Sequence, residues 1–195
     1  MININLYIYE INDNDTTKVE NFFSEYRINK ITDNVKKDLL IKTEHLLKIT
    51  LENEMKKSID KLNIEVSRKG KIVFTDYPTI HFNISHVDKH IIVAYSSHEV
   101  GVDIELITSK HQRLSQRLNE SENRSLIKKW TIIESYVKLF GESIFIDYND
   151  LMISKEIIRG PFGSCYYQSF EFEDNMISVS SPKRFNLAKI IVERV

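Results

Sequence analysis

The order of the periodic segments constrains the fold of this chain more than any other feature of its sequence. Two segments repeat apolar residues at helical spacing, one from about Asp33 to Met55 and one from Glu122 to Phe140, and Gly141 is placed to end the second. The other periodic segments are short and alternate apolar with polar residues, as strands do. Because most of these strands follow one another directly, the pattern predicts an α+β fold.

The first half of the chain combines the first long helix with several strands. Residues 2 to 9 alternate as a strand, and the spacing of Val19, Phe22, Phe23 and Tyr26 predicts a short helix. We expect the helix of residues 33 to 55, with Asp33 as its cap, to lie across one sheet. The strands expected in that sheet are Ile64 to Val66, Ile72 to Phe74, Ile80 to Ile84 and Ile91 to Tyr95.

A second half begins near residue 98. Its first strand is expected from Val100 to Leu106, and helices are expected over 112–118 and 122–140. The remaining strands are expected at Leu151 to Ile153, Tyr166 to Phe172, Met176 to Val179 and Ala188 to Val192. We therefore expect two α+β halves side by side, residues 1–97 and 98–195.

Composition narrows the classes of partner and compartment. The 195 residues include 27 Lys and Arg against 28 Asp and Glu, so no overall charge attracts nucleic acid or an anionic membrane. The single cysteine, Cys165, cannot form an intramolecular disulfide, and no segment approaches the roughly 20 consecutive apolar residues of a membrane span. The first residues contain no basic region followed by an apolar block. We expect a cytoplasmic protein that binds neither nucleic acid nor membrane.

Acidic side chains gather on one predicted strand and one predicted helix. Asp103 and Glu105 face the same side of the strand, with Cα atoms about 6.6 to 7 Å apart, so both can reach one hard cation. The helix adds Glu134 and, one turn on, Lys138. These residues fit a metal site beside a phosphate-binding cation. The alternative is that Glu134 and Lys138 form an ordinary solvated pair on the helix surface.

A second polar cluster lies at the end of the strand that contains Phe82. The alternation points Phe82 inward and Ser85 outward, and His86 ends the strand, where both polar side chains can donate to phosphate oxygens. The alternative for His86 is a turn residue that bonds to backbone. Histidine spacing here matches no zinc motif. Upstream, Gly70 and Lys71 either place an amine beside the same phosphates or form a hairpin turn with an exposed lysine.

Taken together, these segments resemble the ordered motifs of the Sfp-type 4′-phosphopantetheinyl transferases. The matching residues are Phe82-Asn83-Ile84-Ser85-His86, Gly101-Val102-Asp103-Ile104-Glu105, and Trp130 with Glu134-Ser135 and Lys138, with Gly70-Lys71 upstream. The resemblance implies a pseudo-twofold pair of similar α+β halves, each a small, mainly antiparallel sheet on a long helix, with the active site in the cleft between them.

The resemblance also implies an activity and a set of site residues. The enzyme would transfer 4′-phosphopantetheine from coenzyme A to a serine of an acyl or peptidyl carrier protein, releasing 3′,5′-ADP, in fatty acid, polyketide or nonribosomal peptide biosynthesis. Asp103, Glu105 and Glu134 would bind Mg²⁺. Glu134 would also take the serine proton, with Lys138 and His86 as its catalytic partners. Coenzyme A would be held by Lys71, Ser85, His86, Lys138 and Lys42.

Three positions depart from the family pattern. Ile133 replaces a lysine that usually precedes the helix glutamate, Val87 replaces a common serine, and Ile72 replaces the proline that follows Gly70-Lys71 in the family. The long helix offers only Lys36, Lys37, Lys42 and His45 where the family carries arginines for the 3′-phosphate. A non-catalytic homologue that binds coenzyme A or a carrier protein is the first alternative, and an unrelated magnesium-dependent phosphodiesterase is the second. We expect a monomer; the identity of the carrier protein does not follow from the sequence.

Overall fold

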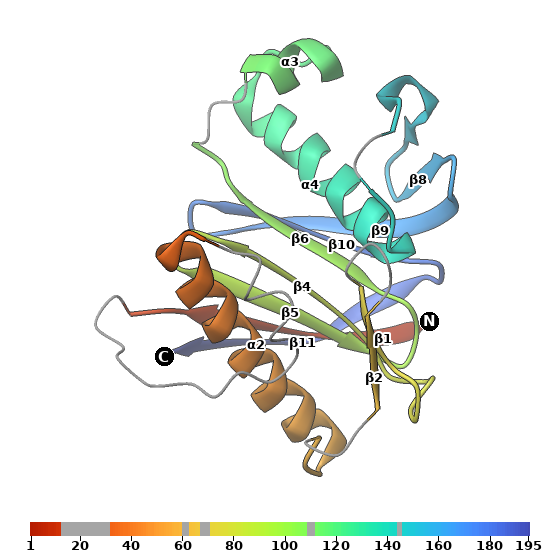
Figure 1. The fold of residues 1–195 in the computed structure, drawn as a ribbon. Coiled ribbons are helices and arrows are strands. Elements are labelled where there is room, and N and C mark those ends of the chain that lie inside the picture. Colours follow the sequence, from red (N-terminus) through yellow and green to blue (C-terminus); the bar gives the residue numbers. More distant parts are fainter. Residues whose placement is uncertain (13–31, 60–62, 67–70, 109–111, 144–145) are drawn as a thin grey trace.

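The computed structural model describes residues 1–12, 32–59, 63–66, 71–108, 112–143 and 146–195. The helix predicted from Val19 to Tyr26 lies outside the described residues. The elements, in chain order, are β1 Ile2–Glu10, α2 Asn34–Met55, β2 Ile64–Val66, β3 Ile72–Phe74, β4 His81–Val87, β5 His90–Ser96, β6 Gly101–Leu106, α3 Gln112–Leu118, α4 Asn123–Phe140, the 3-10 helix η1 Tyr148–Asp150, β7 Met152–Ile153, β8 Ile157–Gly160, β9 Gly163–Phe172, β10 Asn175–Ser181 and β11 Phe185–Arg194. The α+β class expected from the sequence is confirmed (Figure 1).

The strands form two large sheets and one small one. The four-stranded sheet has the order β11-β1-β5-β4, with β1 parallel to β11 and the other pairs antiparallel. The five-stranded sheet has the order β6-β10-β9-β8-β7, and all its pairs are antiparallel. The expectation of one sheet built from residues 64–66, 72–74, 80–84 and 91–95 is wrong, because among the described residues β2 and β3 form a two-stranded sheet of their own, and β5 pairs with the N-terminal strand as well as with β4. Local alternation predicts strands but not their partners.

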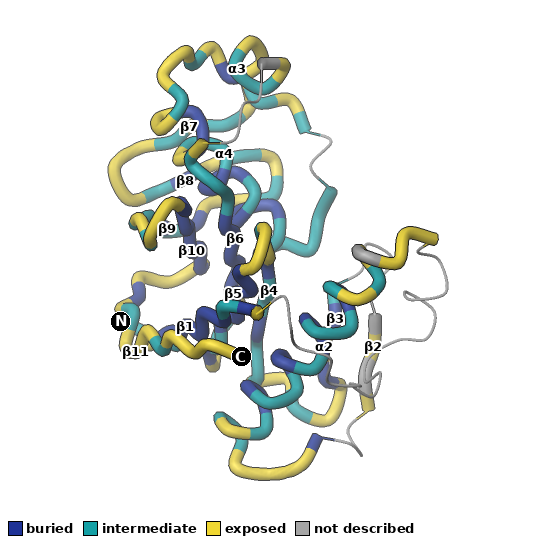
Figure 2. Tube along the Cα trace, turned by 90° about the vertical axis from the view of Figure 1, so that its left-hand side faces the viewer, coloured by how far each residue is buried: buried dark blue, intermediate teal, exposed yellow. Residues whose placement is uncertain are grey.

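The two large sheets face each other, with a helix on each outer face. Residues of α2 pack with one face of the four-stranded sheet, in a cluster that includes Leu47, Leu51, Tyr9 and Ile91. The opposite face of that sheet packs against the five-stranded sheet, and α4 covers the outer face of the latter. Figure 2 shows the buried residues running through the central strands and the exposed residues at the periphery.

Local signals mark the start of both long helices and the end of α4. The Asp33 carboxylate accepts a hydrogen bond from the backbone N–H of Lys36 at 3.3 Å, as a helix N-cap does. Glu122 caps α4 in the same way, by accepting from the backbone N–H groups of the first turn. Gly141 ends α4 in the left-handed conformation, with φ 63° and ψ 33°. These signals fix the register of α4 and therefore which of its residues face β6.

The predicted boundary near residue 98 separates the strands of the two large sheets, with one exception. The last strand, β11, pairs with β1, so residues 185–194 lie in the sheet of the first half. The pseudo-twofold relation between the halves stays a prediction. Within the described residues, no helix is both long and apolar enough to cross a membrane.

Candidate active site

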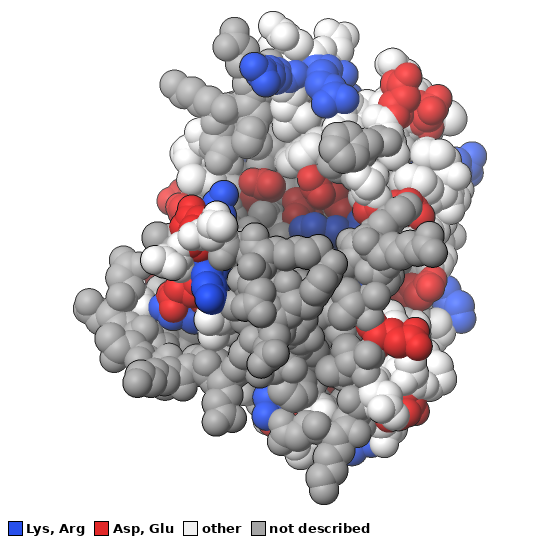
Figure 3. Space-filling model, viewed as in Figure 1, with Lys and Arg blue, Asp and Glu red and all other residues white. Residues whose placement is uncertain are grey.

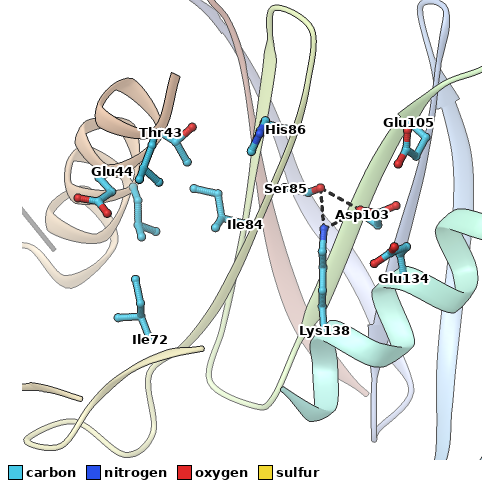
Figure 4. Close-up of a pocket in the computed structure, with 12 residues that line it drawn as sticks. Thr43, Glu44, Ile72, Ile84, Ser85, His86, Asp103, Glu105, Glu134 and Lys138 are labelled. Atoms are coloured by element: carbon cyan, nitrogen blue, oxygen red, sulfur yellow. Dashed lines mark hydrogen bonds and ion pairs between the residues drawn. The ribbon is translucent and has the colours of Figure 1, made fainter. Parts of the chain in front are cut away.

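A cavity of about 300 Å³ lies where α2, β4, β6 and α4 meet (Figure 4). Six residues singled out from the sequence line it, and four apolar and two polar residues complete its wall. The lining residues are Leu40, Thr43, Glu44, Leu47, Ile72, Ile84, Ser85, His86, Asp103, Glu105, Glu134 and Lys138. Figure 3 shows acidic side chains gathered in a hollow on this side of the molecule, with basic side chains directly below them.

The first structural requirement of the site is that β4 and β6 lie side by side. The backbone N–H of Val102 donates to the Asn83 side chain at 3.1 Å, which ties the two strands together although they belong to different sheets. Alternation along β6 then turns Val102 toward the core and Asp103 toward α4. Ser85, on β4, faces Asp103 from the neighbouring strand.

The second requirement is the close approach of α4 to β6, which Gly101 permits. A Cβ atom at Gly101 would lie 2.0 Å from the Ser135 carbonyl oxygen and 2.6 Å from the Leu139 backbone nitrogen. Ser135 and Leu139 directly follow Glu134 and Lys138, so the missing side chain lets this turn of α4 rest on the strand. Hydroxyl pairs fix the helix further, since Ser135 and Ser180 lie 2.7 Å apart.

Asp103, Ser85 and Lys138 form a compact hydrogen-bonded group. The Lys138 ammonium donates to Asp103 Oδ1 at 2.6 Å and to Ser85 Oγ at 2.8 Å, and Ser85 Oγ donates to the same carboxylate oxygen at 2.9 Å. The side chain of Asp103 is 4% exposed, whereas that of Lys138 is 30% exposed. Lys138 therefore pairs with a buried acid of another element. It does not form the solvated pair with Glu134 on the helix surface that the sequence left open as an alternative.

Glu105 and Glu134 lie beside this group in an environment that resists negative charge. Burial, followed by the charge of Asp103, raises the pKa of Glu105 to about 7, although a hydrogen bond from Trp130 and the charge of Lys138 oppose the rise. Burial and then Asp103 also raise the pKa of Glu134 to about 7, against the effect of Lys138. The three acids are therefore mutually repelling, and one lysine compensates them only in part.

We tested whether these residues fit a divalent cation. Among the described residues, no group of three or more His, Cys, Asp and Glu side chains is arranged to hold a metal ion. The chemistry of the group nevertheless suits one: Asp103 Oδ2 is buried and accepts no hydrogen bond within the described part of the chain, and two further acids line the same cavity. Carboxylate oxygens with water are the ligands that Mg²⁺ prefers. The residues fit magnesium in kind and charge.

The remaining predicted residues divide between the cavity and its surroundings. His86 lines the cavity and is exposed on β4, next to the buried Ser85. Lys71 is not a lining residue: its ammonium donates to the Leu139 carbonyl at 2.6 Å, and burial lowers its pKa. Lys42 lies 3.1 Å from Asp38 and borders a different pocket, of about 740 Å³. The part assigned to Lys71 and Lys42 in holding coenzyme A stays a prediction.

The α2 wall of the cavity contains two residues that sequence reasoning missed. Thr43 and Glu44 are 4% and 2% exposed, and both face the cavity from the side opposite the acids of β6 and α4 (Figure 4). A signal was present, because Glu44 lies four residues after Leu40 and three before Leu47, on the apolar face of the helix. A glutamate is rarely buried so fully unless it is paired.

Comparison with curated proteins finds relatives that share one activity in their names. The chain is 36% identical over 95 residues to 4′-phosphopantetheinyl transferase gsp of Aneurinibacillus migulanus, and this alignment covers 42% of this chain and 40% of that protein. It is 26% identical over 138 residues to 4′-phosphopantetheinyl transferase Sfp of Bacillus subtilis (strain 168), covering 59% and 61%. It is also 27% identical over 110 residues to 4′-phosphopantetheinyl transferase ffp of Bacillus subtilis, covering 49% of each.

The chain thus spans about half the length of the curated relatives it matches, between 40% and 61% in these three alignments. No family model matches the chain.

Proposed function

Given that the chain is a relative of the Sfp-type 4′-phosphopantetheinyl transferases, we propose that it moves the 4′-phosphopantetheine group of coenzyme A onto a serine of an acyl or peptidyl carrier protein. The observation that carries the proposal is the convergence of Ser85, His86, Asp103, Glu105, Glu134 and Lys138 on one cavity. They come from β4, β6 and α4, and the sequence motifs that resemble the family place the same residues in its active site.

Lys138, Ser85 and His86 would bind the pyrophosphate of coenzyme A. The Lys138 ammonium and the Ser85 hydroxyl are held at the cavity by Asp103, and both would turn from that carboxylate to donate to phosphate oxygens. His86 is exposed at the mouth of the same wall and adds a donor there. Such preorganised donors stabilise the charge that develops as a phosphoryl group transfers.

Asp103, Glu105 and Glu134 would hold Mg²⁺, which when bound neutralises charge on the phosphate oxygens of the donor. Two observations support this assignment. Burial and mutual repulsion hold the pKa of Glu105 and Glu134 at about 7, so a cation is needed to keep all three acids ionised at neutral pH. Asp103 also has one buried carboxylate oxygen without a hydrogen bond among the described residues.

Glu134 would act as the general base. Glu134 lines the cavity beside Lys138, and a carboxylate that bound Mg²⁺ keeps ionised can accept a proton there. The carrier serine loses its proton to Glu134 as its Oγ forms a bond to the β-phosphorus of coenzyme A. The bond between that phosphorus and the bridging oxygen breaks, and 3′,5′-ADP leaves with the electron pair.

The test is direct. The protein is incubated with coenzyme A, Mg²⁺ and each of several apo carrier proteins, and the carrier is examined by intact-mass spectrometry for the phosphopantetheine adduct. We expect an adduct with at least one carrier, none after EDTA treatment, and none with Asp103→Asn. A protein that binds coenzyme A but modifies no carrier would be the non-catalytic homologue, an alternative that no observation here favours.

A further inference from the structure

Strand β11 forms an open edge of the four-stranded sheet. It pairs with β1 on one side, and among the described residues no strand pairs with its other side. Half of its backbone N–H and C=O groups point along the sheet away from β1, which is the arrangement that another strand can extend. Two apolar side chains of β11 are exposed, Ile190 by 47% and Val192 by 49%, and so is Val195, which directly follows the strand, by 37%.

The register of β11 against β1 defines the two faces of this edge. Ile190 pairs with Leu6 and Val192 with Ile8, so both follow the face of β1 that packs against the five-stranded sheet. Near β11 that covering ends, and both side chains remain exposed. On the other face, Ile191 is half-buried against the α2 cluster.

The order of side chains along β11 is self-complementary. If a second copy of β11 lies antiparallel to the first with Ile191 opposite its own copy, residues whose numbers add up to 382 face each other. Lys189 then faces Glu193 of the second copy, and Ile190 faces Val192. Twofold symmetry repeats both pairs. A shift of the centre to residue 190 would set Lys189 opposite Ile191 and Glu193 opposite Leu187. That register keeps an apolar pair, Ile190 with its own copy, but loses the charge pairing, so the charges favour the centre at Ile191.

We propose that two copies of this chain associate through β11 in this register and form a continuous eight-stranded sheet. Opposite charges and matched apolar side chains on facing strands each stabilise such a pair, and like charges destabilise it. Lys189 and Glu193 are both exposed and therefore available to a second copy. The sequence alone led us to expect a monomer, because the self-complementarity appears only when β11 is known to be an edge.

The interface is expected to be weak. A register shift between Ile4 and Asn5 of β1 interrupts the regular pairing near Ala188, so only the last part of β11 is a regular edge. An interface of this length falls at or below the lower end of stable protein interfaces, and we expect a dissociation constant on the order of micromolar or higher. The dimer would be visible at high protein concentration.

Association through β11 leaves the cavity accessible. β11 and β4 are the two opposite edges of the four-stranded sheet, and the cavity is lined from β4. This inference therefore does not rest on the proposed transfer activity, and changes at β11 are expected to leave that activity unaltered.

Reversing the charges of Lys189 and Glu193 tests both the association through β11 and the register of the two strands. In sedimentation-velocity runs over a concentration series at low salt, Lys189→Glu and Glu193→Lys should each raise the dimer dissociation constant about tenfold or more, because each replaces two attractive pairs by two repulsive ones. The double variant Lys189→Glu/Glu193→Lys should restore the wild-type value. An equimolar mixture of the two single variants should form heterodimers, since every facing pair is then attractive.

Lys155→Glu, a charge reversal at an exposed lysine between β7 and β8, is the matched control and should leave the dissociation constant unchanged. A protein that stays monomeric at every concentration would overturn the proposal. So would a dimer that responds to Lys155→Glu but not to the variants of β11, or single variants that fail to associate with each other. A larger assembly, or pairing only with a strand of another protein, would also contradict it.

Discussion

Replacing Gly101 by alanine would test how strictly the site depends on the contact between β6 and α4. The added Cβ would lie 2.0 Å from the Ser135 carbonyl oxygen, 2.6 Å from the Leu139 nitrogen and 2.9 Å from the Leu139 Cβ. The first two atoms belong to the backbone of α4, so no side chain can rotate away to make room. The helix itself must move.

The size of the movement follows from the shortest contact. An ordinary contact between a methyl carbon and an oxygen is about 3.4 Å, so the backbone at Ser135 must retreat by roughly 1.4 Å. Glu134 and Lys138 lie on this turn of the helix and would move with it, away from Asp103. Displacement of catalytic groups by about 1 Å can lower a rate by roughly 100-fold, and overpacking of this kind costs about 1–3 kcal/mol of stability.

The assay is single-turnover transfer to an apo carrier, measured below the melting temperature of the variant so that folded protein is compared with folded protein. Gly160→Ala serves as control, because its Cβ would meet the ends of two side chains, Leu151 and Tyr136, at 2.5 and 2.8 Å, and not the backbone of α4. We expect both variants to lose stability, but only Gly101→Ala to lose most of its activity per folded molecule. Equal residual activity in the two variants would mean that α4 does not need this contact to position the site.

Three further predictions concern charge in the cavity. Glu105 and Glu134 have a pKa of about 7 in the folded protein and near 4.5 in the unfolded chain, so the folded state binds more protons between these pH values. Without divalent cations the melting temperature should therefore fall as the pH rises from 5 to 8, and MgCl₂ should raise it more at pH 8 than at pH 5. Glu134→Gln should flatten this dependence of the melting temperature on pH, as measured by differential scanning fluorimetry. Lys138→Met should lower kcat by about 100-fold or more while changing the KM for the carrier protein little, because in the proposed reaction its ammonium contacts the transferring group and not the carrier. An unchanged kcat in steady-state assays would remove Lys138 from the catalytic residues. Ile133→Lys should lower the melting temperature, because Ile133 is 1% exposed and its burial contributes about 1.5–3 kcal/mol to stability. It should also raise the rate of transfer per folded molecule by adding a cation beside Glu134. A single-turnover rate equal to that of the wild type would show that the added charge does not reach the cavity.

The elements of the fold could be predicted from the sequence better than their arrangement could. The two long helices follow from apolar periodicity, the start of the first from the acidic cap Asp33 and the end of the second from Gly141, all of which are local signals, whereas the capping role of Glu122 appeared only in the structure. The pairing of β1 with β11 joins residues nearly the full length of the chain apart, and no local pattern encodes such a pair. Nor could alternation show that β2 and β3 form a sheet of their own.

The candidate site shows the same division between local and long-range information. Asp103 and Glu105 share a face because strand residues alternate, and Glu134 and Lys138 share a flank because helix residues recur every turn, so each pair could be read from the sequence. For the α2 wall the sequence indicated only that Glu44 lies on the apolar face of its helix. It did not show that this face meets the cavity, because the position of α2 depends on the packing of the four-stranded sheet. Glu44 therefore entered the site only with the structure.

The pairing of Lys138 with Asp103, and not with Glu134, explains how the site can hold a lysine and three acids at once. A solvated helix pair would leave Asp103 buried without a counter-charge, which is costly. By donating to Asp103 Oδ1, Lys138 compensates the charge of the least exposed of the three acids. Glu105 and Glu134 relieve the remaining repulsion because their pKa values of about 7 keep them largely protonated below that pH. Binding of a divalent cation to the three acids would then displace both the protons and the ammonium. The lysine thereby released would lie at the edge of the cavity where we propose that the phosphate oxygens of the donor bind, so the same contact that stabilises the metal-free site would also keep the proposed phosphate-binding residue in place.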